Sequence, residues 1–74
     1  MTEELVTLLK LFESSTRPLT ARRIAERTKT YQATAKRRVE ALQDELKNTK
    51  TRIRSTRYRE GKRGPASLAW YLER

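Results

Sequence analysis

The apolar residues of this chain change their spacing once, and this change restricts the fold more than any other feature. Up to Leu46 they recur every three or four positions, which is the period of helices that bury one face. From Ile53 onward strand-forming residues are frequent, and Leu68, Trp70 and Leu72 alternate along the chain. The sequence therefore predicts helices followed by a β-hairpin, which is an α+β fold.

Helical spacing predicts three helices, and two of them begin after a capping residue. Thr2 and Thr20 precede the first and the second helix, where a Thr hydroxyl accepts a hydrogen bond from a backbone N–H of the first turn. Pro18 holds the residue before it in extended geometry, so an extended link or a very short strand is expected between these helices. The three helices are expected near residues 3–14, 21–28 and 31–47.

The last third of the chain predicts the hairpin. Residues 51–59 form its first strand, residues 66–72 its second, and the turn lies at 60–65, where glycines and a proline occur. Residues on the inward faces of the helices and of the second strand are expected to be mostly buried: Leu8, Phe12, Ile24, Ala35, Val39, Leu42, Leu68 and Trp70.

Positive charge is concentrated in two segments. The 74 residues include 18 Lys or Arg and 9 Asp or Glu, which gives a net charge of +9. Between Lys47 and Arg63 only Glu60 is acidic, and between Arg22 and Arg38 only Glu26 is acidic. Such segregation favours a polyanionic partner, above all nucleic acid. A basic protein of the ribosomal kind remains an alternative.

The composition also argues against several classes of function. The chain has no Cys and no His, which rules out disulfides and Cys/His metal sites and fits a reducing cytoplasm. It has no Gly-rich phosphate loop and no convergent carboxylates, so we expect no enzyme, no cofactor and no small-molecule ligand. Its apolar runs are too short to cross a membrane. Its length predicts one domain, residues 1–74.

The order of the expected elements is that of a known superfamily. Residues 18–28 (PLTARRIAERT), residues 34–42 (TAKRRVEAL) and the turn at 61–65 are similar to the winged helix-turn-helix superfamily of small prokaryotic and phage regulators. The chain differs from that pattern at Lys29, where a Gly is usual in the turn. The resemblance implies a winged helix-turn-helix fold whose third helix enters the major groove and whose hairpin is the wing.

The resemblance also implies which side chains read the bases. The outward residues of the first half of the third helix are its candidates for base or groove contact: Tyr31, Gln32, Ala33, Lys36 and Arg37. Arg37 and Gln32 are the strongest candidates, because Arg pairs with guanine and Gln with adenine through two hydrogen bonds.

Phosphate contacts are expected from the second helix, which crosses the DNA backbone in this superfamily, and from the wing. The candidates are Thr20, Arg22, Arg23, Arg27, Arg38, Arg59, Lys62 and Arg63. For Thr20, helix capping alone is the alternative.

For several residues of the hairpin, two roles are possible. Arg52 and Arg54 either contact DNA or discourage pairing between sheet edges. Trp70 and Tyr71 either stack on unpaired bases or belong to the core. Tyr58 and Tyr71 are either cross-strand neighbours or part of a dimer surface.

These expectations lead to one function and several alternatives. The favoured function is sequence-specific binding of double-stranded DNA by a transcription regulator, in the cytoplasm or on a prokaryotic nucleoid. The alternatives are an architectural or excisionase-like DNA-binding protein, an RNA- or ribosome-binding protein, and a domain that binds an acidic protein. The sequence leaves open whether the chain acts as a monomer or as a homodimer on a palindromic site.

Overall fold

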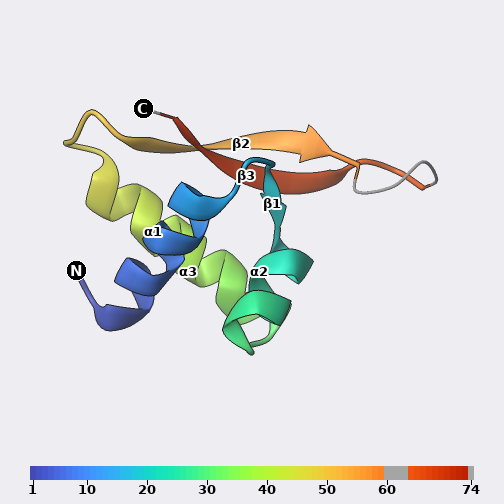
Figure 1. Cartoon of the computed structure of the whole chain (residues 1–74), viewed down its shortest axis with the longest axis horizontal. Coiled ribbons are helices and arrows are strands. Elements are labelled where there is room, and N and C mark those ends of the chain that lie inside the picture. The colour runs from blue at the N-terminus through green and yellow to red at the C-terminus, as the bar shows by residue number, and fades with distance from the viewer. Residues whose placement is uncertain (60–63, 74) are drawn as a thin grey trace.

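The part of the chain that the structure describes folds as three helices and a three-stranded sheet (Figure 1). The structure is a computed structural model that describes residues 1–59 and 64–73. Its elements are α1 (Glu3–Ser14), β1 (Leu19–Thr20), α2 (Ala21–Thr28), α3 (Gln32–Leu46), β2 (Arg52–Tyr58) and β3 (Ser67–Glu73). The predicted α+β class is confirmed. The first two helices have the predicted bounds, and α3 is one residue shorter at each end. Residues 60–63 of the predicted turn lie outside the described part.

The ends of α1 and α2 follow from local hydrogen bonds. The hydroxyl of Thr2 accepts a hydrogen bond from the N–H of Leu5 at 3.4 Å, and that of Thr20 accepts one from the N–H of Arg23 at 3.2 Å. Both predicted N-caps are therefore confirmed. At the other end of α2, Lys29 adopts a left-handed conformation with φ of 55°. This conformation turns the chain from α2 toward α3.

The sheet is antiparallel, with the strand order β1-β3-β2. Trp70 in the central strand is opposite Leu19 of β1 and Ser55 of β2. The helices lie together on one side of the sheet (Figure 1). The extended link expected before α2 thus ends in a two-residue strand that pairs with β3.

The core lies between the sheet and the helices, and most of the predicted core residues are buried. Its members are Leu5, Leu8, Phe12, Leu19, Ile24, Ala25, Ala35, Val39, Leu42, Leu46, Ile53 and Trp70. Trp70 is only 4% exposed, so its side chain is a core residue and is not available for stacking on bases.

The prediction that Leu68 is buried is wrong, because its side chain is 38% exposed. Leu68 shares the inward face of β3 with Trp70 but lies two residues nearer the hairpin turn. Its cross-strand partner Arg57 is exposed as well. The helices cover this face of the sheet as far as Trp70, so alternation places Leu68 on the correct face but beyond the covered area.

No helix within the described ranges combines the length and the apolar character that crossing a bilayer requires.

Candidate nucleic-acid interface

One face of α3 is polar and exposed over its first two turns. Gln32, Ala33, Lys36 and Arg37 are exposed, whereas Ala35 on the opposite face is fully buried. The predicted division of this helix into two faces is therefore confirmed. The first turn carries no acidic residue, so the positive end of the helix dipole is not neutralised there by a side chain of the helix.

Tyr31 stands at the N-cap of α3 and is 84% exposed. Its side chain makes no capping hydrogen bond. An aromatic ring in water at the start of a polar helix face is available for contact with a partner, so Tyr31 belongs with the exposed face of α3.

A groove lies between this face of α3, the start of α2 and the hairpin. We call it the helix–hairpin groove; it has a volume of about 560 Å³. Its polar walls include Arg22, Gln32, Lys36 and Arg59, and its apolar floor includes Leu68. None of the described residues that line it is acidic. The fold thus brings together basic residues from three segments that are far apart in the sequence.

The register of β2 with β3 divides the hairpin arginines between two faces of the sheet. Arg57 is opposite Leu68 and therefore shares the inward face of Ile53, and Arg59 continues that face into the groove. Arg52 and Arg54 lie on the outward face. Arg57 was not among the predicted contact residues, although counting in steps of two from Ile53 identifies it.

The two outward arginines are already engaged within the chain. Arg54 forms an ion pair with Glu73 at 2.8 Å, and Arg52 donates a hydrogen bond to the backbone carbonyl of Lys47 at 3.1 Å. Both side chains thus contribute to the structure of the hairpin, and their two interpretations, DNA contact and discouraging pairing between sheet edges, stay predictions.

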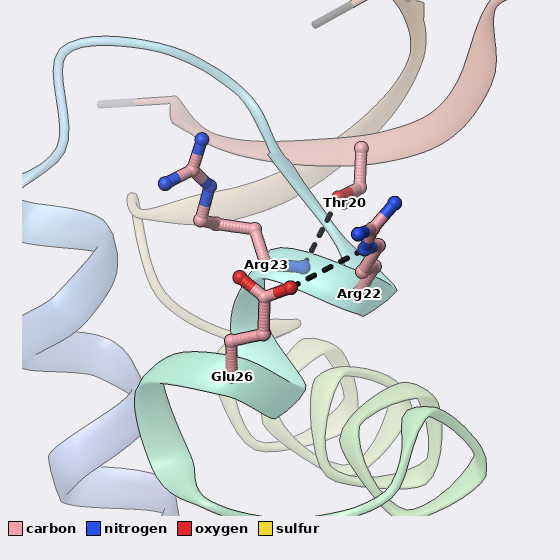
Figure 2. Close-up of polar contacts among 4 residues, drawn as sticks. All are labelled: Thr20, Arg22, Arg23 and Glu26. Atoms are coloured by element: carbon pink, nitrogen blue, oxygen red, sulfur yellow. Dashed lines mark hydrogen bonds and ion pairs between the residues drawn. The ribbon is translucent and has the colours of Figure 1, made fainter.

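The arginines of α2 do not form one surface. Arg22 lines the helix–hairpin groove and forms an exposed ion pair with Glu26 at 3.2 Å. Arg23 extends in another direction from the same turn (Figure 2), and with Arg27 it lines a separate hollow. Successive residues of a helix differ by about 100° in direction, which explains the separation. Of the three, Arg22 is the one that lines the helix–hairpin groove, and phosphate contacts from one or two of these arginines stay a prediction.

Arg38 is also separate from the groove. It is half-buried and lines a hollow next to Glu3 and Glu4 of α1. Thr20 lines the groove but is only 6% exposed, and its hydroxyl caps α2. Capping is thus the role of Thr20 that the structure shows. Lys62 and Arg63 lie outside the described residues.

Within residues 1–59 and 64–73, no group of three acidic side chains comes close enough together to hold a metal ion. Comparisons of the chain with models of protein families, with curated proteins and with solved structures each gave no match. The function must therefore be inferred from the geometry of these surfaces.

Proposed function

We propose that this chain binds double-stranded DNA in a sequence-specific way as a transcription regulator, using a winged helix-turn-helix arrangement. In this proposal the first half of α3 enters the major groove and the β2–β3 hairpin acts as the wing. The observation that carries it is the helix–hairpin groove, where α3, the start of α2 and the hairpin contribute basic or polar residues and no described lining residue is acidic.

The groove has the properties that a DNA backbone requires beside a helix that reads bases. Arg22 and Arg59 border it from α2 and from the hairpin, and either guanidinium can bind a phosphate through two hydrogen bonds. Lys36 borders it from α3. A strand of DNA held there would lie directly beside the exposed face of α3.

The exposed face of α3 supplies the side chains that distinguish base pairs. Arg37 and Gln32 are both exposed, and they suit guanine and adenine respectively. The methyl group of Ala33 suits the thymine methyl in the same way. A face with three different chemical preferences can distinguish sequences, whereas phosphate contacts alone cannot.

Selection of binding sites from random duplex DNA, followed by footprinting, tests the proposal. We expect a defined sequence to emerge and the protected bases to lie on the major-groove side. If no preferred sequence is recovered and all duplexes bind with equal affinity, sequence-specific reading is contradicted.

A matched pair of variants tests whether the groove is the binding surface. Lys36→Ala removes one charge from the groove, and Lys10→Ala removes one charge from the exposed side of α1. We expect the first variant to weaken binding to duplex DNA and the second to bind as the wild type does. Equal losses would mean that affinity follows net charge and not the groove.

A further inference from the structure

A second basic surface lies beside the link between α1 and β1. Two hollows share residues 15–18 of this link as a wall; one has a volume of about 610 Å³ and the other about 310 Å³. Tyr71 lines the larger hollow, and Tyr58 lines the smaller one. We call the two hollows together the link surface. It shares none of its lining residues with the helix–hairpin groove.

Three arginines from different segments meet at the smaller hollow. They are Arg17 from the link and Arg23 and Arg27 from α2. Arg17 and Arg27 are exposed, and neither forms an ion pair with a residue in the described ranges. No acidic residue is among those that line this hollow, and Glu13 is the acidic residue that lines the larger one. Arg17 and Arg27 thus present positive charge to solvent.

Alternation along the strands places both tyrosines on the face of the sheet opposite to that of Ile53 and Trp70. Tyr71 is opposite Arg54, and Tyr58 is opposite Ser67. They are therefore not direct cross-strand neighbours, and their backbones are roughly 13 Å apart along the strands. Tyr71 is 36% exposed and Tyr58 is half-buried, so each ring has a side that solvent reaches. Two separate aromatic rings thus flank the arginines.

We propose that the link surface binds single-stranded nucleic acid, with bases stacked on Tyr71 and Tyr58 and phosphates held by Arg17 and Arg27. Proteins that bind single strands combine a positive surface with aromatic side chains on which successive bases stack. A duplex already stacks its bases internally, so these rings add nothing to duplex binding. The site goes beyond binding of duplex DNA by α3 and does not depend on it.

Fluorescence anisotropy with two labelled probes, twelve thymidines and twelve uridines, tests the proposal, because neither strand pairs with itself. We expect Tyr71→Ala to weaken binding of these probes about 5- to 150-fold, as loss of one stacked base does. Tyr71→Phe keeps the ring and should bind as the wild type does. The two probes differ in the 2′-hydroxyl of the sugar and in the 5-methyl group of the base, so equal binding indicates that neither group contributes.

The arginines are tested with the double variant Arg17→Ala/Arg27→Ala and with Lys10→Ala as the control for charge. The double variant should lower the slope of log affinity against log salt by about 1.4, because two phosphate contacts to a single strand are lost. Lys10→Ala should leave that slope unchanged. Thermal unfolding of each variant shows whether it is folded.

Three results would overturn the proposal. The first is a Tyr71→Ala variant that is folded and binds the single strands as the wild type does. The second is a Tyr71→Ala variant that loses affinity equally for single strands and for a duplex of the same length, which would place both binding sites on one surface. The third is polyglutamate binding with the same dependence on Tyr71, which would identify an acidic protein as the partner.

Discussion

In the proposed function, Arg37 is the residue on which sequence-specific reading depends most. Its side chain is exposed on the half of α3 that enters the major groove in the proposal. Arg37→Ala should therefore cost about 1–3 kcal/mol of binding free energy on the preferred site, because a pair of hydrogen bonds to guanine is lost. Preference should relax at one base position, which competition with single-base variants of the selected site measures.

If Arg37→Ala instead binds every sequence as the wild type does, α3 is not the reading element. Base recognition would then have to come from the hairpin. Lys10→Ala serves as the control, because it removes the same unit of charge from an exposed position on α1.

Lys29 limits the stability of the turn between α2 and α3. Its φ of 55° is unfavourable for a residue with a Cβ atom by roughly 1–2 kcal/mol. Glycine adopts this conformation freely but loses about 0.5–1 kcal/mol through its greater freedom in the unfolded chain. Lys29→Gly should therefore raise the free energy of unfolding by about 0.5–1 kcal/mol, measured by urea denaturation.

Lys29→Ala separates backbone strain from charge. It removes the same positive charge as Lys29→Gly but keeps the Cβ atom, so the strain of the turn remains. Equal stabilisation by the two substitutions would show that the gain comes from reduced charge repulsion and not from the left-handed conformation.

Among the elements, β2 gives the sharpest test, because its alternation divides otherwise similar arginines. Arg57 lies on the inward face that leads into the helix–hairpin groove, whereas Arg54 lies on the outward face in an ion pair with Glu73. Arg57→Ala should weaken specific and random duplexes by similar factors and lower the salt slope by about one. Arg54→Ala should change neither quantity, because Arg54 lies on the other face of the sheet. The variant should also stay folded, since an exposed ion pair contributes at most about 1 kcal/mol to stability.

Binding titrations of both variants over a range of salt concentrations measure these effects. Similar slopes for Arg57→Ala and Arg54→Ala would contradict the division of the strand into a DNA-facing side and an outer side. The comparison is well matched, since both changes convert an exposed Arg of the same strand to Ala.

The elements themselves were predictable because their signals are local. Thr2 and Thr20 cap helices whose apolar spacing continues to their ends, so the bounds of α1 and α2 follow from neighbouring residues. Leu68 could not be predicted in this way. Alternation identifies the face of a strand residue, but its burial depends on how far the helices extend over the sheet, which is a property of the tertiary packing.

The candidate site was predictable only in part for the same reason. The outward residues of α3 follow from helical period alone, since Ala35 and Val39 mark the buried face. The periods also show that Arg22 and Arg23 point in different directions. The helical period does not show which neighbouring element each side chain meets. The tertiary packing decides this, and it places Arg22 in the helix–hairpin groove and Arg23 on the link surface.

At the scale of the whole molecule, the net charge of +9 is distributed over distinct surfaces. In the proposed function, affinity for DNA should therefore depend on how many charges one duplex can reach, which is fewer than the total. The helix–hairpin groove and the two inward arginines of the hairpin offer Arg22, Lys36, Arg57 and Arg59, and Arg37 lies on the adjacent face of α3. These residues supply about five positive charges per protomer that can contact a DNA phosphate or enter the major groove.

Five such contacts predict a specific dependence on salt. The slope of log affinity against log salt concentration should be roughly −4 to −5 per protomer, which amounts to about a 500-fold loss between 50 and 200 mM salt. Anisotropy titrations measure the slope, and sedimentation of the complex gives the number of protomers by which it must be divided. If every basic residue acted together, the slope would be far steeper, and a slope near zero would exclude the cationic surface as the binding site. A value near −4.5 that Tyr71→Ala leaves unchanged would show that a duplex uses the helix–hairpin groove without the link surface.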